Sequence, residues 1–215
     1  MTGIAPDGCP VAVYLALPPM GEAELVHAAT GRGASVLDLG CGTGRIAHGL
    51  VELGHEVVGV DESAEMLTHV RGASTVHSSI AALDLDRTFD AVLMASHLLN
   101  VPDDTERRAR LATGARHLAP GGRLIVQWHP PEWFERVREG EGRAGDVLIA
   151  LRDIQRAGDL LSAVAEYRLR EETWEHPFTA RRLTVTQLHE QLATAGLVFD
   201  SWCTDDRTWF AATRH

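Results

Sequence analysis

Two kinds of hydrophobic pattern alternate along the first two thirds of the chain. Short continuous apolar runs, such as those at 36–39 and 57–60, are typical of buried strands, whereas apolar residues three or four positions apart are typical of helices. The pattern predicts helices over 22–30, 44–53, 63–70 and 104–118, and strands over 35–39, 56–60, 74–77, 90–95 and 122–128. Because strands and helices alternate, we expect an α/β fold with a parallel sheet and right-handed crossovers.

The pattern changes after Trp133. Two long alternating runs flank Ala157-Gly158-Asp159, which is typical of an antiparallel hairpin. The remaining expected elements are the hairpin strands 147–155 and 160–171, a third strand within 173–183, a helix over 184–195 and closing antiparallel strands over 197–203 and 209–213. Gly196 is a suitable end for that helix. The proline-rich start predicts an ordered arm with a short helix around 11–17.

A glycine-rich turn follows the first strand. Gly40, Gly42 and Gly44 stand at alternate positions, so the backbone can approach a ligand closely, and the next helix directs unpaired N–H groups toward it. Asp61 ends the second strand about 20 residues later, where an open α/β sheet places the acid that accepts ribose hydroxyls. The GxGxG spacing differs from the dinucleotide pattern, and Asp38 before the turn can take an ammonium group.

These motifs continue along the chain as VLDLGCGTGR (36–45), VVGVDESAEML (57–67), SSIAALDL (78–85), FDAVLMASHLLN (89–100) and HLAPGGRLIVQWHPP (117–131). Together they resemble the class I S-adenosylmethionine-dependent methyltransferases of the small-molecule type. The resemblance implies a Rossmann-like, seven-stranded, mostly parallel sheet flanked by helices, with an antiparallel β insertion after the fifth strand. It also implies S-adenosyl-L-methionine as cofactor, S-adenosyl-L-homocysteine as product and a small-molecule methyl acceptor.

We interpret the 215 residues, 45% of them hydrophobic, as one domain. Its expected parts are an N-terminal arm or lid with a helix (1–33), a cofactor-binding core (34–132), an insertion over the acceptor site (133–183) and a last helix with closing strands (184–215).

The resemblance also assigns cofactor-binding residues by position. Asp38 and Gly40 match positions near the methionine amine, and Asp61 matches the ribose acid. The other expected cofactor residues are Cys41, Gly42, Thr43 and Gly44 in the turn, Glu62 and Met66 beside sugar and adenine, Ser79 and Ile80 at the adenine, and Ala95 and Ser96 beneath the sulfonium. Ser79 stands where many members have an acid. Tyr14 either anchors the arm or closes over the cofactor as a lid.

The acceptor site has several candidate residues. His97 and His129 follow the fourth and fifth strands, where ligands of open sheets bind, and either imidazole can deprotonate an acceptor near neutral pH. We favour His129 as the base and His97 as a contact; each can instead hold its loop, and positioning without a base is the third possibility. The candidate wall residues are Trp128, Trp133, Trp174, His176 and Phe178, which either line a flat acceptor pocket or attach the insertion to the sheet.

Several chemistries are disfavoured. The chain has 20 Lys and Arg residues together, all of them arginine, so a lysine base or Schiff base is excluded. Cys9, Cys41 and Cys203 lack metal-ligand spacing, and Asp103-Asp104 is better explained as a helix N-cap pair than as metal ligands, so we infer no metal. Pro130-Pro131-Glu132-Trp133 follows the fifth strand, not the fourth, so it does not match the proline–aromatic signature of nucleobase and amide methyltransferases.

Charge and the chain start limit the expected partners. The formal net charge is −10 without a basic block, which disfavours nucleic acid. The start lacks a signal-peptide pattern, and no run is long enough to span a membrane, so we expect a cytoplasmic monomer or homodimer. The predicted function is methyl transfer to an oxygen or nitrogen of a small molecule. The alternatives are an N-methyltransferase of an amine or amino sugar, and a non-catalytic nucleoside-binding module.

Overall fold

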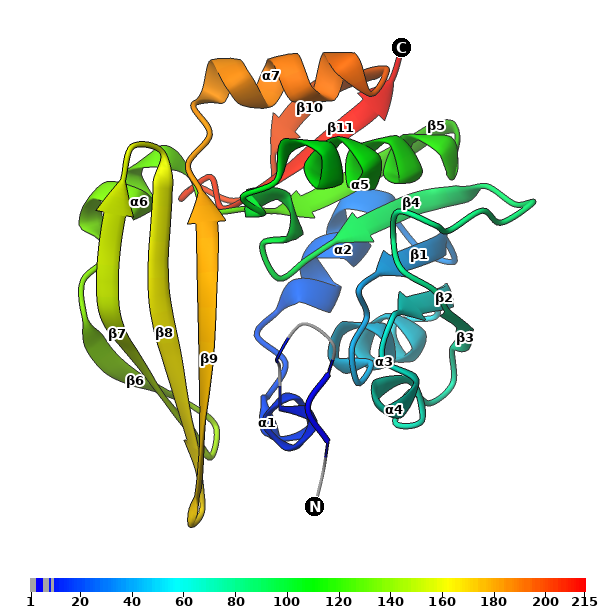
Figure 1. Cartoon of the computed structure of the whole chain (residues 1–215). Helices are drawn as coiled ribbons and strands as arrows, with labels where there is room; N and C mark the ends of the chain where they lie inside the picture. Colours follow the sequence, from blue (N-terminus) through cyan, green and yellow to red (C-terminus); the bar gives the residue numbers. More distant parts are fainter. Residues whose placement is uncertain (1–2, 6–7, 9) are drawn as a thin grey trace.

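Two separate β-sheets form the framework of the protein (Figure 1). The structure is a computed structural model, and it describes residues 3–5, 8 and 10–215, so Cys9 lies outside the described residues. The larger sheet has seven strands in the order β10-β11-β5-β4-β1-β2-β3, and the smaller one has four in the order β6-β7-β8-β9. In Figure 1 the smaller sheet stands beside the larger one, and α1 lies beneath the space between them.

The larger sheet is parallel except at one edge. Its parallel strands are β1 (Ser35–Leu39), β2 (Glu56–Asp61), β3 (Ser74–His77), β4 (Phe89–Met94) and β5 (Leu118–Gln127). The antiparallel strands β10 (Leu197–Trp202) and β11 (Trp209–Arg214) complete it beside β5. This is the Rossmann-like sheet expected from the sequence, and the prediction of an antiparallel insertion is also confirmed.

Helices cover both faces of the larger sheet. One face packs against α5 (Asp104–Arg116) and α7 (Val185–Thr194), and the other packs against α2 (Glu22–Thr30) and α3 (Arg45–Glu52). Neighbouring positions of β1 illustrate the reason, since Leu37 belongs to the first core cluster and Val36 to the second. A strand buried on both faces requires the continuous apolar run that the sequence has there.

The helix ends agree with the expected capping residues. The Asp103 side chain accepts from the backbone N–H of Glu106 at 2.8 Å, as predicted for the N-cap of α5. Thr184 and Gln187 form a capping box at the start of α7. The remaining helices are α1 (Val11–Ala16), α4 (Ala64–Leu67), α6 (Pro131–Arg136) and the 3₁₀ turn η1 (Leu98–Asn100).

The smaller sheet lies between α6 and α7 in the chain and has one strand more than expected. It consists of β6 (Gly140–Ala144), β7 (Val147–Ala157), β8 (Leu160–Leu169) and β9 (Glu172–Arg181), all antiparallel. β6 was not predicted because its sequence, GEGRA, has no alternation of apolar and polar residues; most of its residues are exposed, and it depends on pairing with β7. α6 was also missed, although Pro131 at its first turn is a favourable start.

Candidate functional site

The glycine turn after β1 has a backbone that favours glycine. Gly40, Gly42 and Gly44 have φ angles of 72°, 55° and 87°, in the left-handed region that L side chains rarely adopt. A Cβ atom at Gly42 would lie 3.5 Å from the Met66 sulfur and 3.7 Å from Tyr14 Cδ1. The turn therefore leaves a bare backbone surface between Met66 and Tyr14.

Asp61 connects the end of β2 to this turn. Its Oδ2 accepts from the Gly42 N–H and its Oδ1 accepts from the Ser63 N–H, each at 2.8 Å. An ionised carboxylate has about four lone-pair positions, so both oxygens can accept a further hydrogen bond. Asp61 also lines a cavity of about 640 Å³, so its carboxylate is fixed in position and accessible to a ligand with hydroxyl groups.

Asp38 lies deeper, next to the turn. It is 1% exposed, and its Oδ2 has no hydrogen-bond partner among the described residues. Burial raises the pKa of this carboxyl to about 7, the Arg45 guanidinium acts in the opposite direction and the Asp61 charge adds to the rise. A buried, unpartnered carboxylate oxygen is costly, and a cationic ligand group beside it would offset that cost.

Two side chains of the turn point away from the ligand surface. The Cys41 thiol packs on Gly59 of β2, where an added Cβ would come within 2.7 Å of its sulfur. The Thr43 hydroxyl donates to the backbone oxygen of Tyr14 at 3.3 Å, which holds the N-terminal segment near the turn. Cys41 and Thr43 thus leave the turn's ligand-facing surface to the backbone, while the Tyr14 side chain lines the cavity.

One cavity of about 640 Å³ joins this turn to the smaller sheet. Its lining includes most of the expected cofactor residues, namely Tyr14, Gly40, Gly42, Asp61, Glu62, Met66, Ser79, Ile80 and Ser96. Its opposite part is lined by His97, Leu98, Glu106, Arg110 and His129, and by Ala144, Ile149, Ala165, Tyr167, His176, Phe178, Thr179 and Ala180 of the smaller sheet. Ala95, 5% exposed, lies beneath Ser96 in the core and does not reach the cavity.

The two candidate histidines meet in this cavity. Ser96 and His97 have φ angles of 54° and 61°, an uncommon conformation for two successive non-glycine residues and one that is frequent at functional sites. The His97 ring stacks on His129 with 3.5 Å between centroids, and His129 stacks on Trp133 at 3.7 Å. The sequence placed both histidines at neighbouring strand ends, and the structure brings their rings into contact.

The histidine stack lowers the basicity of both rings. Burial lowers the pKa of His97 to about 4, and a hydrogen bond with the Trp128 backbone acts in the opposite direction. Burial, followed by the charge of His97, lowers the pKa of His129 to about 2. Both imidazoles are therefore neutral near pH 7 and are weak bases.

The sequence was compared with those of known protein families. A family model described as "Methyltransferase domain" matches residues 36–122, the segment that holds the glycine turn, Asp61 and strands β1 to β4. This segment of the chain therefore matches a methyltransferase domain. The match agrees with the resemblance found in the sequence motifs.

Curated relatives match about half of the chain. The cypemycin N-terminal methyltransferase of a Streptomyces species is 37% identical over 111 residues, which are 48% of this chain and 45% of the relative. The dTDP-3-amino-3,4,6-trideoxy-alpha-D-glucopyranose N,N-dimethyltransferase of Streptomyces venezuelae is 37% identical over 119 residues, 52% of this chain and 50% of the relative. The chain thus spans about half the length of these relatives.

Solved structures of methyltransferases share the fold over nearly the whole chain. An S-adenosylmethionine-dependent methyltransferase from Clostridium acetobutylicum ATCC 824 superposes with a TM-score of 0.77 at 16% identity and covers 94% of each chain. CalS10, an amino pentose methyltransferase from Micromonospora echinaspora, gives a TM-score of 0.71 at 24% identity over 90% of this chain and 89% of its own. At these identities the similarity shows the fold alone.

The five aromatic candidates for the acceptor wall fall into different environments. Trp128 is fully buried in the core, where its Nε1 donates to the Arg207 carbonyl at 2.7 Å, so it does not line the pocket as expected. Trp133 lies behind His129, and neither it nor Trp174 is among the residues that line the cavity. His176 and Phe178 do line it.

Several residues that line the cavity were missed by sequence reasoning. Tyr167 and Ile149 face each other across β7 and β8, and their signal was the alternation of the hairpin strands. Glu106 and Arg110 form an ion pair one helical turn apart, which in a sequence is the same pattern as an ordinary solvated pair.

Within residues 3–5, 8 and 10–215, no helix has both the length and the apolar character needed to span a membrane.

Proposed function

We propose that this chain transfers a methyl group from S-adenosylmethionine to the amine nitrogen of a small molecule. The observation that carries the proposal is the single cavity joining the Asp61 turn to the smaller sheet through His97 and His129. A methyl donor and an acceptor require adjoining subsites that keep the reacting atoms close together. A non-catalytic nucleoside-binding module is less well supported, because the cavity beyond Ser96 is open.

The residues of the turn fit the cofactor. In this proposal Asp61 accepts from the ribose hydroxyls, the unpartnered oxygen of Asp38 receives the methionine ammonium group, and Met66 and Ile80 contact the adenine. Ser79, whose hydroxyl accepts from the Ala82 N–H at 3.3 Å, stands near the adenine edge. When bound, the cofactor supplies a methyl group on a sulfonium, which is already activated for transfer.

The acceptor part of the cavity supports nitrogen rather than a hydroxyl oxygen as the methylated atom. A neutral amine is a nucleophile without further activation, whereas an alcohol needs a base that removes its proton. His97 and His129 are weak bases because burial lowers the pKa of each ring. We therefore assign positioning and exclusion of water to the histidine stack, in place of the general-base role expected for His129.

The names of the relatives support the same choice. The cypemycin relative is named as an N-terminal methyltransferase, and the Streptomyces venezuelae relative as an N,N-dimethyltransferase of an amino sugar. Both names specify nitrogen as the methylated atom. They agree with an amine acceptor for this chain without identifying the molecule that carries the amine.

The proposed function is tested first by binding and then by transfer. Calorimetry is expected to give saturable binding of S-adenosylmethionine and S-adenosylhomocysteine. Incubation of the protein with methyl-labelled cofactor and a panel of primary and secondary amines is expected to give N-methylated products. Absence of cofactor binding, or methylation confined to hydroxyl compounds in a matched alcohol panel, would refute the proposal.

A further inference from the structure

The smaller sheet forms a wall of the cavity without charged side chains. The eight residues that the smaller sheet contributes, Ala144, Ile149, Ala165, Tyr167, His176, Phe178, Thr179 and Ala180, include no Asp, Glu, Lys or Arg. Ile149 pairs with Tyr167, and Ala165 pairs with His176, so these side chains share one face of the sheet. The side chains on this inner face are apolar and aromatic, with the imidazole of His176 and the hydroxyl of Tyr167, whereas Thr179 pairs with Ser162 on the other face.

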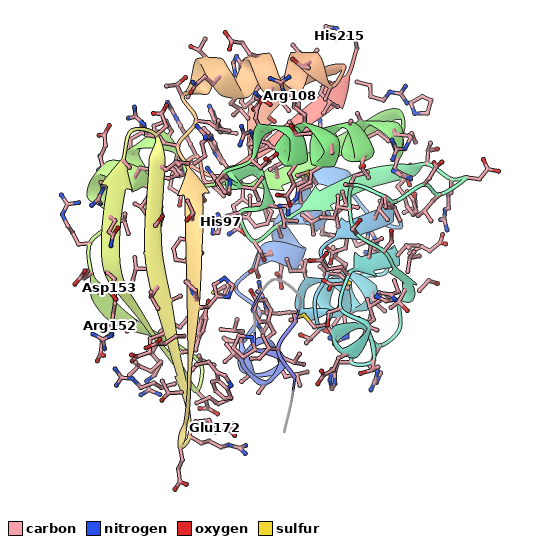
Figure 2. The ribbon with its side chains drawn as sticks, in the orientation of Figure 1. His97, Arg108, Arg152, Asp153, Glu172 and His215 are labelled. Atoms are coloured by element: carbon pink, nitrogen blue, oxygen red, sulfur yellow. The ribbon has the colours of Figure 1, made fainter. Side chains whose placement is uncertain are left out.

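A cluster of charged side chains lies on the other face of the smaller sheet. Arg152 contacts Glu166 at 3.3 Å, and Arg168 contacts Glu166 at 2.6 Å and Glu141 at 3.9 Å. Figure 2 shows Arg152 on the side away from the larger sheet and His97 on the side toward it. The sheet thus separates a charged outer face from an uncharged wall of the cavity.

The two arginines among the described lining residues, Arg45 of α3 and Arg110 of α5, each have a carboxylate partner. Arg45 forms an ion pair with Glu22, and both side chains are mostly buried, at 16% and 7% exposed. Arg110 forms an ion pair with Glu106, and its other terminal nitrogen donates to the Leu98 carbonyl at 2.8 Å. The positive charge of each guanidinium is therefore already balanced by a carboxylate and is not available in full to an anionic group of an acceptor.

The described residues that line the cavity therefore carry more negative than positive charge. Its carboxylates are Glu22, Asp61, Glu62 and Glu106, and its guanidinium groups are Arg45 and Arg110. The histidines of the stack add no positive charge near neutral pH, since both rings have lowered pKa values. A phosphate or carboxylate brought into this cavity would lose its hydration without gaining a cationic partner, which is unfavourable.

From this arrangement we propose that the acceptor is an amine on an apolar body, without phosphate or carboxylate groups. The inference rests on the proposed function, since it concerns the acceptor of the same transfer. Its ammonium form is attracted by the negative lining on approach and releases its proton to solvent water before the nitrogen attacks the methyl group. Its apolar body packs on Ile149, Phe178 and the alanines of the inner face. A dTDP-linked amino sugar, the substrate in the name of one relative, does not suit this site because it carries a diphosphate.

The test uses acceptor pairs that differ only in an anionic group. The probes are 2-phenylethylamine against phenylalanine, and tyramine against tyramine phosphate. Calorimetry on the protein saturated with S-adenosylhomocysteine is expected to show that each uncharged-body amine binds at least about tenfold more tightly than its anionic partner. Equal or tighter binding of phenylalanine or tyramine phosphate overturns the inference, and so does failure of both 2-phenylethylamine and tyramine to bind.

A pair of variants identifies the groups responsible. Glu106→Gln removes the carboxylate partner of Arg110 at the cavity. It is expected to reduce the ratio of dissociation constants between tyramine phosphate and tyramine by about threefold or more. Glu166→Gln makes the same charge change on the outer face and is expected to leave the difference unchanged. An equal effect of both variants would overturn the assignment. The proposed function fails separately, by loss of S-adenosylhomocysteine binding before any amine is added.

Discussion

The two halves of the cavity are built in different ways. The half beside β1 and β2 is made largely of backbone, with three glycines at positive φ and a carboxylate that accepts two N–H groups. The half beneath the smaller sheet is made of side chains from one sheet face and from α5. The backbone-built half, beside β1 and β2, can therefore change little without losing its geometry. In the side-chain-built half, beneath the smaller sheet, single residues can be replaced while the fold is kept.

The largest expected effect concerns Asp61 in the backbone-built half. Asp61→Ala removes the proposed hydrogen bonds to the ribose, worth about 1.5–3 kcal/mol each, and frees the Gly42 N–H. We expect the affinity for S-adenosylmethionine to fall by more than about a hundredfold in calorimetry. Glu56→Ala, an exposed change on the same strand, is the control, and unchanged affinity of the Asp61 variant would contradict the ribose assignment.

Asp38 gives the next largest effect and a dependence on pH. Because its pKa is raised from 3.8 to about 7, the protonated carboxyl stabilises the unliganded fold, and this stability is lost as pH rises between those values. Cofactor affinity should rise over the upper part of this range as the carboxylate forms. Asp38→Asn is expected to abolish the pH dependence of folding stability, measured by thermal unfolding, and the pH dependence of cofactor affinity, measured by calorimetry. It is also expected to weaken cofactor binding at pH 8 by about tenfold. Parallel slopes in both proteins would be evidence against Asp38 as the ammonium partner.

Phe178 tests the side-chain-built half. Phe178→Ala shortens an inner-face side chain, and we expect the KM for 2-phenylethylamine to rise about fivefold with cofactor affinity unchanged. Trp174→Ala is a matched control, because Trp174 is a neighbouring aromatic residue of β9 that does not line the cavity. If the Trp174 variant changes KM as much as the Phe178 variant, the acceptor wall extends further along β9 than proposed.

The smallest effect is expected for His129. Its pKa is lowered to about 2, so its ring stays neutral across the working range and contributes no acidic limb to the pH profile. His129→Ala is expected to reduce kcat less than about threefold, through loss of ring packing, whereas general-base catalysis is worth about a hundredfold or more. A hundredfold loss together with the disappearance of an acidic limb would restore the base assignment that the sequence favoured.

The sequence was most informative where the signal is local. The glycine turn and Asp61 lie within one strand–turn–helix–strand unit, and the register of β1 on β2 follows from their apolar runs. The contact of His97 with His129 was also foreseeable in part, since β4 and β5 are parallel neighbours and both residues follow strand ends. The burial of both rings was not foreseeable, because it depends on Trp133, and the helix α6 that carries Trp133 was not predicted.

The acceptor half was harder to predict for a physical reason. Trp128 and His129 are adjacent, yet the first points into the core and the second lines the cavity, and only the packing of β11 and the smaller sheet decides which. The charge balance of the cavity likewise depends on Glu106 facing inward from α5. Sequence patterns give the periodicity of an element, but not which partner covers each of its faces.

The fit of Cys41 against Gly59 has a practical consequence. Burial raises the pKa of the Cys41 thiol, and the carboxylates of Asp38 and Asp61 add to the rise, so the folded chain holds an unreactive thiol at the join of β1 and β2. Alkylation at this sulfur requires these two strands to separate. The rate at which iodoacetamide modifies Cys41, followed by mass spectrometry, therefore reports how often the glycine turn opens. A bound nucleoside is expected to slow this modification.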